Sequence, residues 1–306
     1  MIKNLKNYLI YLLNLALFIA IIFYSIKYWN FIKTNLSLIK LSPLLISFIF
    51  LFLILILASF RWKFLLDIFN KKTSFKDIFW IYNASGIYKY VPPKGINYII
   101  RFEFFKKLNL ELEGKITSIL GEGFLDVYIA LLYAIILILT IFKINMLSSI
   151  ILFSVVILAT LAILKFEIFI KLLELFKIKS NKIMLFFKNF KTLTKSRLFY
   201  YAILTTILMT LLHGLAFYFS SKALSINISI LSSIIIFSSS QFLAFIMFSP
   251  AGLGVRDASI ITLLKLQGLT IEQSILLALL YRVIIFISEL IFGVISISNI
   301  YRKKSI

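Results

Sequence analysis

Apolar stretches about as long as a bilayer is thick recur along this chain, and they constrain its fold more than any other feature. A helix needs about 20 apolar residues to cross the roughly 30 Å hydrocarbon core of a membrane. The chain is 61% hydrophobic, well above the roughly 45–50% of soluble domains. We therefore expect an integral membrane protein whose 306 residues form one all-α, multi-pass helical bundle.

The apolar pattern predicts seven spanning helices, at residues 8–26, 41–60, 115–141, 146–164, 198–219, 226–248 and 273–298. Two further apolar segments, 80–105 and 250–266, are broken by Pro, Gly and charged residues, which favours half-helices or re-entrant hairpins. Seven crossings would put the two basic termini on opposite sides of the membrane. Counting 250–266 as part of an eighth crossing would bring them to one side, and the sequence leaves this choice open.

Positive charge is concentrated between the spans and sets the expected orientation. The formal net charge is +21, and the links 61–113 and 165–197 carry most of the inter-span Lys and Arg. Basic loops stay in the cytoplasm and attract anionic lipid, so we expect both links and both termini on the cytoplasmic side of the inner membrane. The second link begins with helically spaced charges opposite Phe, Ile and Leu, which predicts an amphipathic surface helix. Nucleic-acid binding is not expected, because the chain has no basic folded module.

The string from Pro250 to Asp257, Pro-Ala-Gly-Leu-Gly-Val-Arg-Asp, interrupts apolar sequence with a helix breaker, two glycines and a charge pair. At membrane depth, non-helical backbone is tolerated only where protein buries it or where it lines a wet cavity. A similar string begins at Pro92, and the two strings correspond at an offset of about 157–159 residues; such repeated breaks point to a transporter binding site. We predict that the loops of one cavity include Pro92, Pro93, Gly95, Pro250, Gly252 and Gly254.

Charged residues inside the predicted spans are candidates for function. Glu122 and Asp126 lie four residues apart, hence on one helix face, and Arg282 and Glu289 share a face of the last span. Each charge costs about 2.5–3.5 kcal/mol near the bilayer centre. In one interpretation, Arg282 pairs with Glu122 or Asp126 and holds helices together. In the other, the charge pair in 250–257 brings the count to four acids against two bases, which leaves about two carboxylates for a proton, water or a cationic ligand.

Other polar residues favour packing roles. We expect His213 to form a hydrogen bond inside the bundle, and Gln241 with the serines at 238–240 to hold helices together or to line a cavity. Tyr82 and Tyr90 are interpreted as interfacial anchors. The chain has no cysteine and no zinc-protease, serine-hydrolase or P-loop motif. We therefore expect neither an enzyme nor a metal or cofactor site.

Several of these stretches together resemble a known family. They are Lys89-Tyr90-Val91-Pro92, Glu122-Gly-Phe-Leu-Asp126, the string at 250–257, Tyr281-Arg282, and Glu289. In this order they resemble the membrane domain of lysylphosphatidylglycerol synthase/flippase proteins, and the similarity covers essentially the whole chain. The chain departs from the family pattern at Pro93, at Ala251, and at Gly123, where the family has Arg. Asp257 replaces a family Glu with the charge kept.

The resemblance implies a protein that moves lipids, such as aminoacylated phosphatidylglycerol or lipid-linked sugars, between leaflets. We expect no aminoacyl-transferring domain, and hence no synthesis of lysyl-lipid. In this hypothesis Lys94, Arg101 and Arg256 contact an anionic phosphate, while Glu122, Asp126 and Glu289 meet protons or a cationic headgroup. The full set of predicted binding residues is Lys94, Arg101, Glu122, Asp126, Arg256, Asp257, Arg282 and Glu289. Two alternatives remain, namely a non-transporting accessory protein for a membrane-bound lipid or glycan enzyme, and, less supported, a membrane-embedded transferase.

Overall fold

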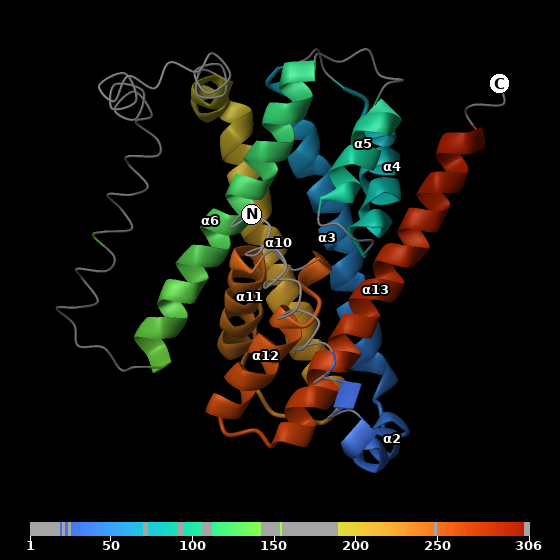
Figure 1. The fold of residues 1–306 in the computed structure, drawn as a ribbon, viewed down its shortest axis with the longest axis vertical. Coiled ribbons are helices and arrows are strands. Elements are labelled where there is room, and N and C mark those ends of the chain that lie inside the picture. Colours follow the sequence, from blue (N-terminus) through green and yellow to red (C-terminus); the bar gives the residue numbers. More distant parts are fainter. Residues whose placement is uncertain are drawn as a thin grey trace, which may run out of the picture.

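The computed structural model describes residues 19, 22–23, 26–69, 73–90, 95–105, 112–141, 154, 189–247 and 250–302. These residues form helices and no strand, so the predicted all-α bundle is confirmed. Four helices are long and apolar enough to cross a membrane within this part of the chain. They are α3 (Leu41–Asp67), α6 (Leu112–Ile141), α10 (Arg197–Ala223) and α13 (Ile271–Arg302), and they run through the whole bundle (Figure 1).

The shorter helices form two hairpins that enter the bundle from opposite ends (Figure 1). The first hairpin consists of α4 (Phe75–Gly86), η1 (Ile87–Tyr90) and α5 (Ile96–Phe105). The second consists of α11 (Ile230–Ile246), η2 (Pro250–Gly252) and α12 (Val255–Leu266). Their tips, η1 and η2, are in contact. A further short helix, α2 (Trp29–Leu36), lies at the end from which the second hairpin enters.

Each hairpin has an arm that is too short to cross a bilayer. At 1.5 Å per residue the 12 residues of α4 or α12 span about 18 Å, roughly half of a membrane core. The predicted half-helices at 80–105 and 250–266 are therefore present. The predicted crossing at 226–248 is wrong, because α11 ends inside the bundle and α12 returns to the end where α11 began (Figure 1). For the same reason 250–266 adds no eighth crossing.

Other predicted boundaries also need correction or lie outside the described residues. The cytoplasmic link was expected to begin at Arg61, but α3 continues to Asp67 and so carries Arg61 inside the helix. The predicted spans at 8–26 and 146–164 fall almost entirely outside the described residues. The same is true of the amphipathic link at 165–197, apart from its last residues.

The two halves of the described bundle are related by inverted topology. The α3, first hairpin and α6 series runs in the opposite direction to the α10, second hairpin and α13 series (Figure 1). Corresponding helices begin 155 to 159 residues apart, which accounts for the offset between the two broken strings. Inverted repeats with broken helices at the midplane are typical of secondary transporters.

Serine caps and glycine contacts help define the second half. Ser196 and Ser229 precede α10 and α11, and their side chains accept hydrogen bonds from Leu198 N and Ser232 N, satisfying amides that a helix start leaves unpaired. Gly214 of α10 lies so close to α11 that an added Cβ would sit 2.6 Å from the Ile234 Cα. The helices can pack this tightly because Gly has no side chain.

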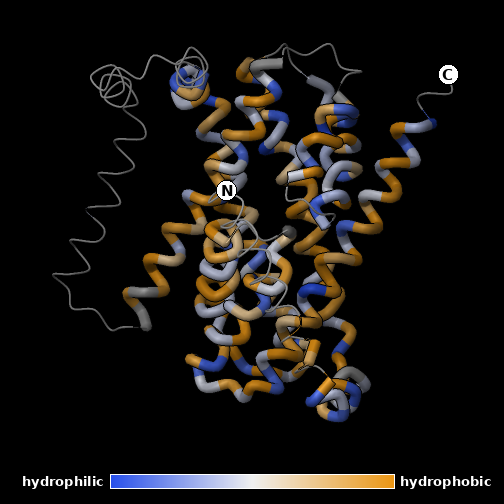
Figure 2. Tube along the Cα trace, in the orientation of Figure 1, coloured by the Kyte–Doolittle hydropathy of each residue, from blue (hydrophilic) through white to orange (hydrophobic). Residues whose placement is uncertain are grey.

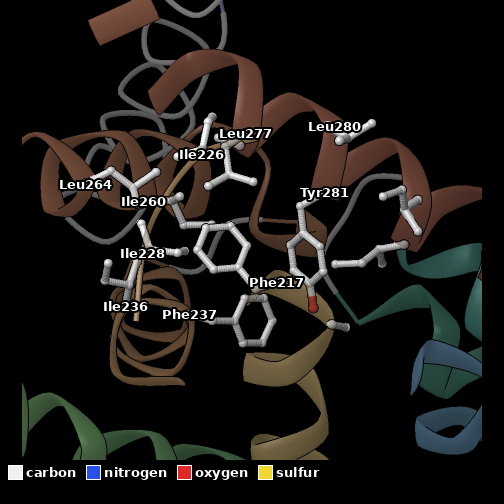
Figure 3. Close-up of a cluster of buried hydrophobic side chains, with 14 of the residues drawn as sticks. Phe217, Ile226, Ile228, Ile236, Phe237, Ile260, Leu264, Leu277, Leu280 and Tyr281 are labelled. Carbon is white, nitrogen blue, oxygen red and sulfur yellow. The ribbon is translucent and has the colours of Figure 1, made fainter. Parts of the chain in front are cut away.

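Apolar packing fills the space between the second hairpin and the long helices. The Tyr281 ring lies 5.1 Å from the Phe217 ring and 5.4 Å from the Phe237 ring, both edge-on (Figure 3). Hydrophobic residues also run along the outer lengths of the long helices (Figure 2). Exposed residues such as Leu204 and Val294 suit a lipid-facing surface.

Candidate functional site: a charged cavity between two hairpins

A cavity of about 300 Å³ lies where the two hairpin tips meet. Gly95 from the first broken segment and Gly252 from the second both line it. The structure thus brings the two broken segments to one place. The polar and charged residues of its lining include Arg61, Tyr82, Lys89, Arg101, Glu122, Asp126, His213, Gln241, Arg256 and Glu289.

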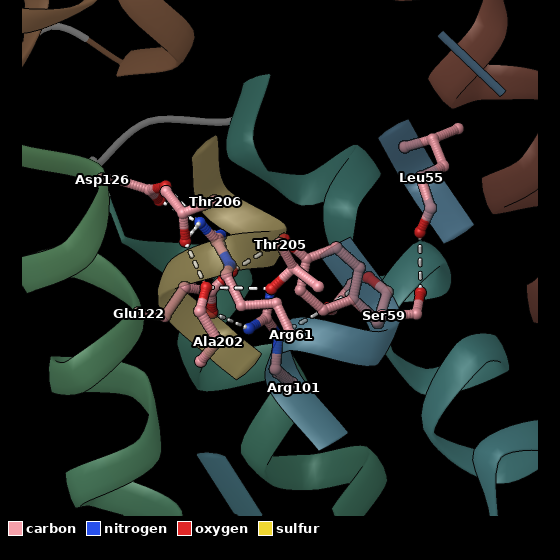
Figure 4. A network of polar contacts seen from close by, with 11 residues as sticks. Leu55, Ser59, Arg61, Arg101, Glu122, Asp126, Ala202, Thr205 and Thr206 are labelled. Atoms are coloured by element: carbon pink, nitrogen blue, oxygen red, sulfur yellow. Dashed lines mark hydrogen bonds and ion pairs between the residues drawn. The ribbon is translucent and has the colours of Figure 1, made fainter. Parts of the chain in front are cut away.

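Glu122 is the centre of a buried ion-pair network on one side of the cavity (Figure 4). Arg61 Nη2 lies 2.8 Å from Glu122 Oε1, and Arg101 Nη1 lies 2.7 Å from Glu122 Oε2. Arg61 also pairs with Asp126, and Tyr82 donates its hydroxyl to Glu122 at 2.7 Å. The network joins α3, α4, α5 and α6. Its two arginines and two carboxylates balance one another.

Arg101 is held from several directions within this network. Its guanidinium lies 4.5 Å from the Trp62 ring centre and 4.3 Å from that of Tyr82, and its Nε donates to Ser85 Oγ at 3.1 Å. With its Nη1 committed to Glu122, Arg101 is a structural partner of the carboxylate. The count that left carboxylates unmatched is therefore wrong, because it omitted Arg61 and Arg101.

Glu289 is the centre of a second polar cluster. Lys89 Nζ lies 2.5 Å from Glu289 Oε1, and the Tyr90 hydroxyl donates to Glu289 Oε2 at 2.8 Å. The Tyr90 ring packs edge-on against Phe286 at 5.1 Å. The interpretation of Tyr82 and Tyr90 as interfacial anchors is wrong, since both hydroxyls donate to carboxylates that line the cavity. In hydrocarbon a carboxylate needs such partners.

Arg282 and Asp257 form a third pair beside the loop of the second hairpin. Arg282 Nη2 lies 2.7 Å from Asp257 Oδ2 and donates to Gly252 O at 3.2 Å. The expectation that Arg282 pairs with Glu122 or Asp126 is therefore wrong. Asp257 also accepts from Gly254 N at 3.4 Å, so it occupies the α12 N-terminus that a ligand phosphate would otherwise approach.

The backbone of this loop requires unusual conformations. Gly252 and Gly254 have φ of 71° and 79°, values that suit glycine. Ala251 has φ of 47°, a left-handed conformation that costs a residue with a Cβ roughly 1–2 kcal/mol. The turn aims the first residues of α12, Arg256 among them, at the cavity.

Arg256 differs from the other cations of the cavity. It is 7% exposed, its Nη1 donates to Gln241 Oε1 at a long 3.5 Å, and its guanidinium lies 6.0 Å from the Phe237 ring centre. No described carboxylate lies within ion-pair distance of it. Arg256 is thus a buried cation, lining a cavity, whose charge no described side chain balances.

The remaining predicted residues have mixed outcomes. His213 does form an internal hydrogen bond, with Nδ1 3.1 Å from the Tyr281 hydroxyl, as predicted. Gln241 and Ser238 line the cavity, and the hydroxyls of Ser238 and Ser240 both donate to backbone oxygens of their own helix. Lys94, Pro92 and Pro93 lie outside the described residues.

Sequence reasoning missed Arg61, Lys89 and the roles of two tyrosines. The signal available for Arg61 was the apolar residues that follow it, because Trp62 and Leu65 are buried in the same helix and carry the helix past Arg61. No group of three or more His, Asp or Glu side chains in the described ranges is placed to hold a metal ion.

The amino-acid sequence matches the family described as the lysylphosphatidylglycerol synthase TM region, over residues 11–293. The chain belongs to this family. It is also 31% identical over 121 residues to a UPF0104 membrane protein of Methanocaldococcus jannaschii, a match that covers 39% of this chain. The match covers 52% of that relative, so the chain spans about half the length of the curated relative that it matches.

In this member of the lysylphosphatidylglycerol synthase TM family, four of the five stretches that carry the resemblance contribute lining residues to the cavity, and Tyr281-Arg282 is the exception. Glu122 and Asp126 pair with Arg61 from α3. Gly123, where the family pattern has Arg, has open space beside it, since an added Cβ would meet nothing within 4 Å. The acids in this helix are thus neutralised from other helices, without the family arginine.

Proposed function

We propose that the protein moves a lipid headgroup between the two leaflets of the membrane, with the charged cavity as the headgroup site. The observation that carries the proposal is the meeting of two oppositely directed hairpins at one buried, charged cavity. Membrane transporters bind their substrates at such midplane junctions of broken helices. The proposal includes no covalent step, so the protein would act without being an enzyme.

The size of the cavity supports a headgroup as the bound part. Its volume of about 300 Å³ lies at the lower end of the range for small-molecule sites. The acyl chains would remain in the bilayer, against the apolar outer faces of the long helices. A polar lining lowers the cost of bringing the headgroup to membrane depth, where an unsolvated charge is expensive.

The contacts between the two halves suggest how access could alternate. The Arg61, Arg101 and Glu122 network lies within the first half, and the Arg282–Asp257 pair lies within the second. The Lys89–Glu289 pair joins the halves across the cavity. In our proposal this pair separates when one half rocks against the other, and the cavity then opens toward one leaflet.

The proposed orientation follows from the charged links. α3 ends and α10 begins at one end of the bundle, which is also where α13 ends (Figure 1). The sequence next to these helix ends is basic, with Lys71 and Lys72 after α3 and Lys195 and Arg197 at the start of α10. We propose that this end faces the cytoplasm, because basic loops remain there. The membrane would be the cell's inner membrane, and a membrane-bound biosynthetic enzyme could supply the lipid.

Reconstitution into liposomes tests the function. Fluorescent lipids in the inner leaflet are protected from a membrane-impermeant quencher, so headgroup movement appears as an increase in the quenched fraction. We expect the protein to accelerate quenching at least tenfold over protein-free vesicles, and Glu289→Gln to reduce this rate. Lys265→Gln, which removes an exposed charge from α12, is the matched control. Equal rates with and without protein would contradict the proposal and favour the accessory-protein alternative.

A further inference from the structure

We infer that the cavity selects an anionic phosphate group, carried by a lipid of net negative charge, and that Arg256 binds this group. The inference rests on the proposed function, because it names the substrate class of the same cavity. It goes against an aminoacylated, cationic lipid as the preferred substrate. Three observations support it: the charge of the lining, the state of Arg256, and the absence of a free acid among the described lining residues.

The lining carries one more positive than negative charge among its described residues. Its cations are Arg61, Lys89, Arg101 and Arg256, and its carboxylates are Glu122, Asp126 and Glu289. Each of these carboxylates has a cationic partner within ion-pair distance. The positive charge that remains is that of Arg256. A buried, unbalanced charge is costly, and a bound anion would balance it.

The chemistry of Arg256 suits a phosphate. A guanidinium presents several N–H donors in a plane and can bind two phosphate oxygens at once. Arg256 makes one long hydrogen bond, to Gln241, which leaves donors available. Arg282 Nη1, beside the same loop, is also buried and has no hydrogen-bond partner in the described part of the chain. Two arginines around one loop thus hold unused donors.

The charges of the cavity lining also disfavour an aminoacylated headgroup. A lysyl ester of phosphatidylglycerol carries two ammonium groups besides its phosphate, so its headgroup is positive overall. These ammonium groups would need carboxylates, and those of the lining are already paired with arginine or lysine. Placing them near Arg256 and Lys89 would add repulsion between like charges. A singly negative phosphodiester instead matches the excess charge.

A binding experiment with the purified full chain in detergent tests the inference. Short-chain phosphatidylglycerol, phosphatidylcholine and lysyl-phosphatidylglycerol are titrated separately, and the thermal shift gives each affinity. We expect phosphatidylglycerol to bind at least about tenfold more tightly than the other two. Arg256→Gln should weaken its binding by about tenfold or more, the value of a lost charge-assisted hydrogen bond. Arg256→Lys should restore part of it, and Lys265→Gln should leave it unchanged.

A competition experiment with inorganic phosphate distinguishes the two possible sources of the phosphate group, a lipid headgroup and the free ion. Competition by millimolar phosphate would mean that the site recognises the free anion as well as the lipid. Tighter binding of lysyl-phosphatidylglycerol would overturn the inference, and so would phosphatidylglycerol binding that Arg256→Gln and Arg256→Lys both leave intact. If Arg256→Gln fails to fold, as judged by gel filtration, the comparison of the three lipids on the native chain still tests the charge preference, and Arg256→Lys still tests the role of Arg256. Equal movement of all three lipids in liposomes would contradict this inference and still support the proposed function. Selective binding of phosphatidylglycerol without movement would support the inference and contradict the proposed function.

Discussion

Lys89 in η1 and Glu289 in α13 lie 200 residues apart in sequence and form an ion pair of 2.5 Å between Nζ and Oε1. Both residues line the central cavity. The ion pairs of Arg61, Arg101 and Arg282, by contrast, connect elements within one half of the bundle. The Lys89–Glu289 pair therefore connects the tip of the first hairpin to the last helix of the second half.

A double-mutant cycle on this pair should reveal a coupling. Lys89→Met and Glu289→Gln should each lower the thermal stability in detergent, because each leaves a charged group without its partner inside the bundle. The double variant should lose less than the sum of the two, with a coupling of about 1–3 kcal/mol. Differential scanning fluorimetry with a denaturant series gives the four stabilities. Additive losses would mean that the two residues do not interact in the folded protein.

Much of the fold could be predicted because unpaired backbone groups cost several kcal/mol in hydrocarbon. The Pro and Gly clusters at 92–95 and 250–254 therefore indicated breaks lined by protein, and the described parts of both hairpins agree. The crossing predicted at 226–248 is wrong because an apolar run indicates how long a helix is, but not whether the chain continues across the membrane after it. Such a run looks the same whether its helix crosses the membrane or turns back halfway as α11 does.

The candidate site could be predicted only in part. Glu122 and Glu289 stood out as acids inside apolar runs, but their partners come from distant elements. Arg61 follows the apolar run at 41–60 directly and so looked like the start of a basic link. Lys89 lay in a segment already read as broken. Pairing between helices depends on tertiary packing, which local spacing does not record.

Arg61 is expected to be essential for stability. Arg61→Met removes the cationic partner of Asp126 and one of the two cationic partners of Glu122, and breaking a buried ion pair typically costs about 3–5 kcal/mol. Lys63→Met is the matched control in the same helix. Lys63 pairs with Asp67, which also accepts hydrogen bonds from Thr73 N and Thr73 Oγ1. The Asp67 carboxylate therefore keeps partners when Lys63 is removed, and the loss should be about 1 kcal/mol. Thermal unfolding in detergent measures both, and equal losses would refute a special role for the buried network.

Ala251→Gly should stabilise the protein. Ala251 has φ of 47°, and a glycine there avoids the left-handed penalty of roughly 1–2 kcal/mol, less the larger entropy that Gly loses on folding. We expect a net gain of about 0.5–1 kcal/mol. Ala258→Gly, inside α12, should instead lose about 1 kcal/mol. Thermal unfolding in detergent should show a gain in stability for Ala251→Gly and a loss for Ala258→Gly. A loss in both variants would contradict the left-handed conformation of Ala251.

Gly214→Ala should be costly, because α10 and α11 meet at this residue. An added Cβ would lie 2.3 Å from the Ile234 Cγ1 and 2.6 Å from its Cα, so the backbone of α11 must shift, and such overpacking costs about 1–3 kcal/mol. Gly123→Ala makes the same chemical change within α6, where a Cβ meets nothing within 4 Å. It should raise stability by about 0.5–1 kcal/mol, the difference between Ala and Gly inside a helix. Melting temperatures of the two variants should therefore move in opposite directions from that of the native chain, and a neutral Gly214→Ala would mean that the two helices lie farther apart than described.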